Sequence, residues 1–506
     1  MTWLASQPRL VAVHLGLCAL VLLWDLYIAG RTAQLRATPR PMALLSALAG
    51  LLLVPALVVF LVSNSMLSGR ALFSIAWVWP VTVALVAAQA VYALFRRLAA
   101  PPIAISIAVF DLLLAVTYAA RYAMFIGHPV PAPLVALVAA QRGALAFSAQ
   151  PLALRTPWLV YVPIFAPATP GRRGGGTLLR TAVATIAAAW AALAVVDVPG
   201  ATRAVRSYGR YAGERLQERP DSDFAIGVKI FPTLRKGPPP LSIQSDLALA
   251  DTVGAEVLSV YVTPAGATPA TLDSIAHTLD DARGDRRLVV ALDLSAERPV
   301  PAARRARYLG ARAADVERIV RRLRPDYVVP VLDPTGAAER AIGAVGARGW
   351  IAYLSEAAAA AHRARPVTRV MVHLGGFGPR DSTLYAWAVS PSAPVQAVGL
   401  SLFPWLGGAN ALDARMRAAD AWLRAYRSDR EHWVLETGGF PLAHGEASQA
   451  RAIWGTLAWA TSRAAVKGVI AYDAGDYEAP EGLRAPGGRL RPAAALLRAA
   501  VLSLGE

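Results

Sequence analysis

The pattern of apolar positions divides the chain into two parts. In residues 1–198, long apolar runs recur with few charges inside them. Each run is long enough to cross a hydrocarbon core of about 30 Å as a helix that rises 1.5 Å per residue. The pattern therefore predicts a helical membrane domain of about six spans. They cover residues 10–30, 42–64, 71–95 and 102–126, one net crossing within 129–168, and 178–198.

Basic residues in the short connections predict the orientation of these spans. Arg31, Arg36 and Arg40 follow the first run, and Arg96 and Arg97 follow the third. Connections rich in Arg stay on the cytoplasmic side. The first run is too long for a signal peptide and lacks a clear cleavage site, so we expect it to be retained. An even number of spans then places the N-terminus and the C-terminal part outside, at a bacterial inner or plasma membrane.

Polar side chains interrupt the apolar runs at Asp25, Gln89, Asp111 and Arg121, and also at His14. An ionisable residue in a membrane span is a functional-site hypothesis by default. One alternative is a channel or transporter that uses Asp111 and Arg121. The favoured interpretation is structural, with Asp111 and Arg121 paired inside the bundle.

From residue 223 short apolar strands alternate with helical patterns, after a polar, arginine-rich linker at residues 199–222. Each strand is a nearly continuous run of Val, Ile and Leu, as expected when helices cover the sheet. Eight such units match a (β/α)8 TIM barrel of about 250 residues, predicted here over 223–506. An open doubly wound sheet would have a glycine-rich first turn, which this sequence lacks. The predicted strands are 224–232, 257–264, 287–295, 326–334, 369–376, 396–404, 432–438 and 467–475.

Composition narrows the classes of function. The chain is 55% hydrophobic and only 17% charged, which favours a membrane protein over a soluble one. Its net charge of +17 comes from scattered arginines without a compact basic stripe, so we expect no nucleic-acid partner. The single cysteine excludes an intrachain disulfide and a Cys-based metal site. His373, His432 and His444 are isolated in the sequence, so we expect neither a metal nor a cofactor.

The polar and aromatic residues at the predicted strand ends are the candidate site, because barrel active sites lie at the C-terminal ends of the strands. Carboxylates there can act as acid, base or nucleophile. Aromatic faces suit stacking on sugar rings, and we expect the residues other than Asp293 and the two catalytic carboxylates, Glu436 and Asp333, to bind substrate. The residues are Lys229, Tyr261, Asp293, Asp333, His373, Ser401, Phe403, Trp405, Glu436, Tyr472 and Asp473.

Some of these residues have a structural alternative. Lys229 is expected to form a salt bridge with Asp293, and Asp476 to be a solvated loop acid. Glu436 follows the apolar run Trp433–Leu435, where an unpaired buried carboxylate is costly unless it serves a site. Its alternative role is to cap a neighbouring helix or to pair with an arginine.

Two segments resemble the clan A glycoside hydrolases, (β/α)8 barrels with two catalytic carboxylates. Residues 436–441 (ETGGFP) resemble the seventh-strand signature E-T-G-[WY]-P of β-1,3-glucanase-like and β-galactanase-like members. Residues 398–405 (VGLSLFPW) resemble their sixth strand. The resemblance covers about residues 223–500, and it implies that Glu436 is the nucleophile of a retaining mechanism.

The fourth strand departs from that family. A retaining mechanism needs a second carboxyl group about 5 to 5.5 Å away. The family places a Glu after an Asn there, whereas this chain has Leu332, Asp333 and Pro334. Asp is one methylene shorter, so Asp333 is the expected acid/base only if the site has adapted. The alternatives are that Glu339 or Asp473 substitutes, or that the barrel has lost hydrolysis.

The sequence therefore predicts a membrane-anchored, extracytoplasmic retaining glycosidase or transglycosidase that acts on a β-linked polysaccharide or oligosaccharide. The bilayer and a polysaccharide synthase or exporter are its expected partners. The alternative is a catalytically degenerate, glycan-binding barrel in an exopolysaccharide assembly.

Overall fold

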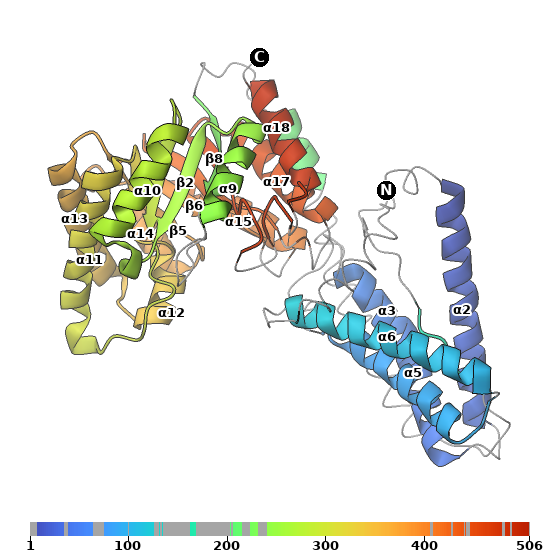
Figure 1. Cartoon of the computed structure of the whole chain (residues 1–506). Coiled ribbons are helices and arrows are strands. Elements are labelled where there is room, and N and C mark those ends of the chain that lie inside the picture. Colours follow the sequence, from blue (N-terminus) through green and yellow to red (C-terminus); the bar gives the residue numbers. More distant parts are fainter. Residues whose placement is uncertain are drawn as a thin grey trace. The chain divides into compact units, whose positions relative to one another are not determined.

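The chain forms two compact units in a computed structural model, and each is described separately (Figure 1). One holds the long apolar helices, and the other begins at Arg206 and holds a barrel. The structure describes residues 8–34, 39–63, 75–99, 101–125, 131, 134, 162–167, 203, 206–214, 223–230, 240–404, 408–426, 429–439, 441, 446–477, 481–485 and 488–504.

The first unit contains four long helices among its described residues: α2 (Pro8–Gln34), α3 (Arg40–Ser63), α5 (Val78–Phe95) and α6 (Pro101–Phe125). Three of them, α3, α5 and α6, are long and apolar enough to cross a membrane. They correspond to the second, third and fourth predicted spans. The predicted count of six is therefore not supported. The crossing within 129–168 lies largely outside the described residues, and the one at 178–198 lies entirely outside them.

Residues 162–167 have no regular secondary structure, and buried carboxylates from two helices bond to their backbone. The Ile164 N–H donates to Asp111 Oδ1 at 2.9 Å, and the Phe165 N–H donates to Asp25 Oδ1 at 2.9 Å. Buried backbone groups outside regular secondary structure must find hydrogen-bond partners within the protein or in bound water. Asp25 and Asp111 supply them, which accounts for two acidic residues within apolar helices.

Gln89 completes this arrangement from α5. Its Nε2 donates to the Ala166 carbonyl at 2.9 Å, and its Oε1 accepts the Ala166 N–H at 3.0 Å. The predicted pairing of Asp111 with Arg121 is replaced by other contacts. The Asp111 carboxylate bonds to backbone, as described above, while the Arg121 guanidinium lies 4.9 Å from the centre of the Phe60 ring.

The second unit is built on a closed barrel of eight parallel strands in sequence order, with β8 pairing with β1. This confirms the predicted barrel. Continuous apolar strands are buried along their length because helices cover the outside and side chains fill the inside. The strands are β1 (Ala225–Ile230), β2 (Val257–Val262), β3 (Arg287–Leu292), β4 (Tyr327–Val329), β5 (Arg369–Leu374), β6 (Ala397–Ser401), β7 (Glu431–Thr437) and β8 (Val466–Ala471).

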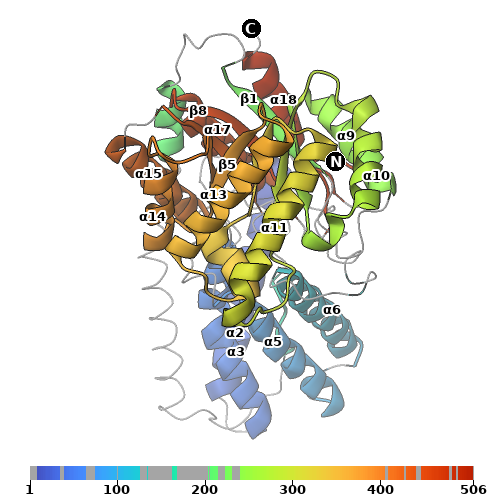
Figure 2. The same ribbon diagram turned by 90° about the vertical axis from the view of Figure 1, so that its left-hand side faces the viewer.

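Helices surround the strands (Figure 2). In α11, for example, Leu309, Val316 and Val320 recur at helical spacing and are buried, while Arg318 between them is exposed. The helices are α9 (Pro240–Val253), α10 (Pro269–Ala282), α11 (Ala302–Leu323), α12 (Glu339–Ile342), α13 (Ala347–Ala364), α14 (Pro379–Ala388), α15 (Gly408–Ala425), α17 (Glu446–Thr461) and α18 (Pro492–Leu504), with the short turns η1 (Pro264–Gly266) and η2 (Pro334–Ala338).

Glycines beside β7 make room for its large inward side chains. A Cβ on Gly468 would lie 2.3 Å from Trp433 Cζ3, and one on Gly399 would lie 2.4 Å from Leu435 Cδ1. Larger residues at these two positions would displace Trp433 or Leu435. This packing fixes the part of β7 that leads to Glu436.

Part of the predicted linker packs on the barrel. Residues 206–213 are helical, and the Ser207 hydroxyl donates to Asp413 Oδ1 of α15 at 2.8 Å. Tyr208 is fully buried, and its ring occupies the space that a side chain on Gly455 of α17 would need.

The stability of the barrel is predicted to fall as the pH drops from about 6.5 to about 4, in part through His432. This buried imidazole donates from Nδ1 to the Arg430 carbonyl and accepts from the Tyr385 hydroxyl, both at 2.9 Å. Burial lowers the pKa of His432 to about 4. The unfolded chain therefore binds the proton first, and up to about 3 kcal/mol is lost across this interval. Thermal unfolding of wild type and His432→Gln should show the difference in pH dependence. Equal dependence in both would contradict it.

Asp111 is predicted to hold residues 162–167 by accepting a backbone hydrogen bond. Asp111→Leu should lower the thermal stability of the detergent-solubilised chain, because an unpaired buried N–H costs about 1–3 kcal/mol. Asp111→Asn keeps an acceptor of similar shape and is the matched control. A Leu variant as stable as the Asn variant would contradict this role.

Candidate functional site

Glu436 lies near the C-terminal end of β7, and its side chain is 15% exposed. The Tyr261 hydroxyl of β2 donates to Glu436 Oε1 at 3.1 Å. His373 of β5 places Nε2 3.8 Å from Glu436 Oε2. The carboxylate is thus oriented from two other strands at the barrel opening, and it neither caps a helix nor pairs with an arginine in these contacts.

The hydrogen bond at Nδ1 of His373 determines which tautomer the ring adopts. The Asp333 backbone N–H donates to His373 Nδ1 at 2.9 Å, so Nδ1 carries no proton. The ring proton is on Nε2, which faces Glu436 and has no hydrogen-bond partner among the described residues. His373 therefore presents a donor toward the carboxylate.

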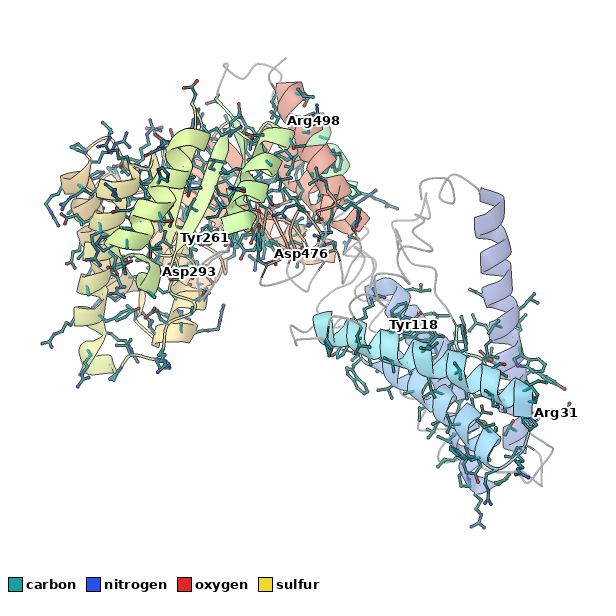
Figure 3. The ribbon with its side chains drawn as sticks, viewed as in Figure 1. Arg31, Tyr118, Tyr261, Asp293, Asp476 and Arg498 are labelled. Carbon is teal, nitrogen blue, oxygen red and sulfur yellow. The ribbon has the colours of Figure 1, made fainter. Side chains whose placement is uncertain are left out.

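Lys229 and Asp473 form a buried ion pair beside Glu436. Lys229 Nζ lies 3.2 Å from Asp473 Oδ2 and 4.0 Å from the centre of the Tyr472 ring. Burial acts to lower the pKa of Lys229, but the Asp473 carboxylate outweighs it and raises the pKa above its usual value. The predicted Lys229–Asp293 salt bridge is wrong. Asp293, labelled in Figure 3, follows β3. Its Oδ1 accepts the Ser295 N–H at 2.8 Å and closes a local turn.

Aromatic rings form part of the same opening. The Phe403 and Tyr472 rings meet edge to face at 6.0 Å, and Tyr261 lies 6.1 Å from Tyr472. Phe403 is buried, and a Cβ on Gly438 would lie 2.8 Å from its ring, so Gly438 allows this packing. Trp405 lies outside the described residues.

Asp333 uses its carboxylate in local structure. Its backbone is left-handed at φ +40°, and Oδ2 accepts the Ala337 N–H at 2.7 Å, capping η2. Oδ1 is buried against Gly375 and has no hydrogen-bond partner among the described residues. The β4 carboxylate is therefore held by the turn that follows it.

Two other acids have structural roles. Glu339 Oε1 accepts the backbone N–H groups of Val345 and Gly346 at 3.1 and 3.0 Å. Although burial opposes it, these bonds lower the pKa of Glu339 overall. An ionised, fully bonded carboxylate does not suit the acid role considered for it. Asp476 is not solvated, because it forms a buried ion pair with Arg491.

Arg415 of α15 was not singled out from the sequence. Its Nη1 donates to the carbonyls of Gly375 and Ser401, at 2.5 and 3.0 Å. Its charge interacts with Glu436 and Asp333. Ser401 itself is buried, and its carbonyl anchors this arginine. Arg415 is one of several arginines on an amphipathic helix, so its spacing in the sequence did not distinguish it as a site residue.

Glu481 is a second residue that the sequence did not indicate. It lies on the loop after β8, is buried, and interacts electrostatically with Lys229, Asp473 and Glu436. Burial raises the pKa of Glu481 to about 8. Glu481 lies nine residues after Tyr472 and is not at the end of a predicted strand. A search restricted to strand ends therefore does not select it.

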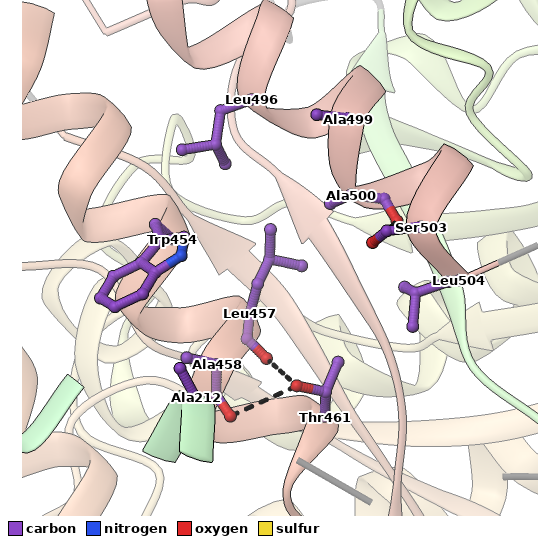
Figure 4. A pocket seen from close by; sticks show the side chains of 10 residues that line it. All are labelled: Ala212, Trp454, Leu457, Ala458, Thr461, Leu496, Ala499, Ala500, Ser503 and Leu504. Carbon is purple, nitrogen blue, oxygen red and sulfur yellow. Dashed lines mark hydrogen bonds between the residues drawn. The ribbon is translucent and has the colours of Figure 1, made fainter. Parts of the chain in front are cut away.

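Other features of the described residues do not compete as catalytic sites. No group of three or more His, Cys, Asp or Glu among them could hold a metal ion. A pocket of about 330 Å³ on the outside of the barrel is lined by α17, α18 and Ala212 (Figure 4). Its walls are mainly apolar, and the Thr461 and Ser503 hydroxyls donate to carbonyls of their own helices.

Comparison with known proteins found similarity to solved structures only. No family model matches the chain, and no curated protein matches it. Among solved structures, a β-glucuronidase from Ruminococcus gnavus in complex with uronic deoxynojirimycin is 13% identical, with a TM-score of 0.41, over 57% of this chain and 51% of that one. A β-glucuronidase from an uncultured Clostridium sp. is 12% identical, with a TM-score of 0.43, over 57% and 52%. The chain thus spans about half the length of these two proteins. Likeness of this extent does not identify a reaction for this chain.

Replacing Lys229 is predicted to destabilise the barrel. Lys229→Met leaves the buried Asp473 carboxylate without its cation, which costs about 3–5 kcal/mol. The double variant Lys229→Met/Asp473→Asn should recover part of this loss because the buried charge is gone. Thermal unfolding of the single and double variants measures the coupling. Additive losses would contradict a paired role.

Proposed function

We propose that this chain is a membrane-anchored retaining glycosidase or transglycosidase that acts on a β-linked polysaccharide, with Glu436 as the nucleophile. The observation that carries the proposal is the placement of Glu436. It is a partly exposed carboxylate at a barrel strand end, oriented by the Tyr261 hydroxyl and facing His373 Nε2. The resemblance of residues 398–405 and 436–441 to clan A sequences supports the same role.

The surroundings of Glu436 suit a nucleophilic carboxylate. An oxygen of Glu436 would bond to the anomeric carbon as the glycosidic bond breaks, and the departing oxygen would take a proton from a second acid. Water would then attack the same carbon, giving its proton back to that second group, and release Glu436. Tyr261 orients the carboxylate, and the positive charge of Arg415 interacts with it. Tyr472, Phe403 and Trp405 are proposed to border the sugar subsite.

Asp333 is the acid/base that strand position suggests, but its carboxylate would have to leave the cap of η2 to act. This observation favours one alternative function. The barrel would bind glycans without cleaving them, as a subunit of an exopolysaccharide synthesis or export system.

The apolar helices are proposed to anchor the barrel in a bacterial inner or plasma membrane. The helices α3, α5 and α6 are long and apolar enough to span it. The arginine pattern of the connections favours a barrel on the outer side, beside a polysaccharide synthase or exporter.

Turnover of polysaccharides by the purified full-length chain in detergent tests this function. Panels of β-glucan, galactan and mannan should reveal a substrate through new reducing ends. Glu436→Gln should lower the rate by about 10³-fold or more, because the nucleophile is lost. Glu431→Gln is the matched control on the same strand, since Glu431 bonds to the Tyr327 hydroxyl at the other end of β7. Glycan binding by the wild type without turnover would support the binding alternative and contradict hydrolysis.

A further inference from the structure

The ring of His373 is enclosed in the barrel with only one of its two nitrogens satisfied. Its side chain is 1% exposed, and Nδ1 accepts the Asp333 backbone N–H at 2.9 Å. Nε2 is buried and has no hydrogen-bond partner among the described residues. A buried N–H without an acceptor is unfavourable, and native proteins leave few of them. The position of this one beside the candidate nucleophile suggests a use for it.

The acceptor that Nε2 faces is the carboxylate of Glu436. Nε2 lies 3.8 Å from Oε2, whereas Oε1 accepts the Tyr261 hydroxyl at 3.1 Å. A distance of 3.8 Å is too long for a hydrogen bond of this kind, which spans about 2.7–3.2 Å. One carboxylate oxygen is therefore bonded, and the other is a short movement away from a donor that has no partner.

Glu436 is the group that can make this movement. The final torsion of a Glu side chain is broad, so its carboxylate turns at little cost. The His373 ring is buried and anchored at Nδ1, so it stays in place. Hydrogen bonds in an active site are often long in the free protein and shorten only during the reaction. Because the ring has almost no exposed surface, the carboxylate suits Nε2 better than a substrate oxygen does.

We propose that His373 is a positioning residue for Glu436, and that its Nε2–H donates to Glu436 Oε2 as Glu436 leaves the sugar in the second step of the reaction. This assignment rests on the proposed function, in which Glu436 is the nucleophile. Tyr261 from β2 and His373 from β5 then hold one carboxylate oxygen each. His373 acts through Glu436 in this role and does not bind substrate.

The charge on Glu436 explains why the contact matters in the second step. In the covalent intermediate Glu436 is an uncharged ester. As the water oxygen bonds to the anomeric carbon, the bond between that carbon and Glu436 breaks, and its electron pair returns to the carboxylate. The water gives one proton to the second acid group. A hydrogen bond to a carboxylate favours its charged form. The Nε2–H of His373 therefore stabilises the transition state more than the ester, which increases the rate of release.

Two substitutions separate the roles of the two ring nitrogens. The amide of Asn reaches the position of Nδ1, so His373→Asn keeps an acceptor for the Asp333 N–H and removes the donor toward Glu436. The amide of Gln reaches the position of Nε2, so His373→Gln keeps that donor.

The kinetics of the full-length chain on 4-nitrophenyl β-glucoside, β-galactoside and β-mannoside test the assignment. His373→Asn should lower kcat by about 10–10²-fold, as expected for the loss of one hydrogen bond to a charged group. The value of kcat/KM should change much less, because it reports the first step. A burst of nitrophenol should precede the slow phase, since the covalent intermediate accumulates. His373→Gln should restore most of kcat.

Reactivation of enzyme trapped with a 2-deoxy-2-fluoro glycoside measures the second step directly, and it should be slower in His373→Asn by a similar factor. His432→Gln, which alters a buried histidine of β7, is the matched control and should show no burst. If His373→Asn does not fold, the reactivation rate of His373→Gln decides, because a rate well below that of wild type would contradict the role of the donor.

Two results would overturn the assignment while Glu436 remains the nucleophile. One is an equal loss of kcat and kcat/KM in His373→Asn without a burst, and the other is a His373→Gln variant as slow as His373→Asn. A wild type that neither turns over a nitrophenyl glycoside nor forms the trapped adduct would overturn the proposed function, and this assignment with it.

Discussion

Charge pairing inside a low-dielectric barrel opening is the constraint on which the candidate site depends. A buried ion pair is stable only when each charge keeps a close partner. Lys229 and Asp473 meet this condition at 3.2 Å, and the Tyr472 ring lies against the ammonium group. Around this pair, Glu436 remains partly exposed with a hydroxyl donor, while burial raises the pKa of Glu481 to about 8. These two carboxyl groups, which interact electrostatically, thus lie in different environments.

The same requirement explains the polar residues of the apolar helices. Residues 162–167 leave regular secondary structure, and their backbone groups bond to Asp25, Asp111 and Gln89 from three helices. An N–H group without water must find an acceptor in the protein. The acids that suggested a transport pathway are therefore accounted for, in their described contacts, by holding a segment without regular secondary structure.

Much of the barrel could be predicted from the sequence, because continuous apolar runs at regular intervals leave few alternatives. The strand-end rule also found Glu436, His373, Lys229 and Asp473. The sequence could not show that Lys229 pairs with Asp473 and not with Asp293, because this depends on which side chains come into contact in the closed barrel. Arg415 and Glu481 arrive from a helix and a loop, and no local pattern marks them. The described helices support three of the six predicted spans, and length and hydropathy alone do not show that residues 162–167 lack regular secondary structure.

Trapping of a covalent intermediate tests the central claim most directly. The full-length chain would be treated with 2-deoxy-2-fluoro glycosides that carry an activated leaving group, and the adduct would be located by peptide mass spectrometry. The account predicts one added glycosyl group on the peptide that contains Glu436, and none in Glu436→Gln. An adduct on another carboxylate, or turnover of the activated substrates without any adduct at Glu436, would contradict it.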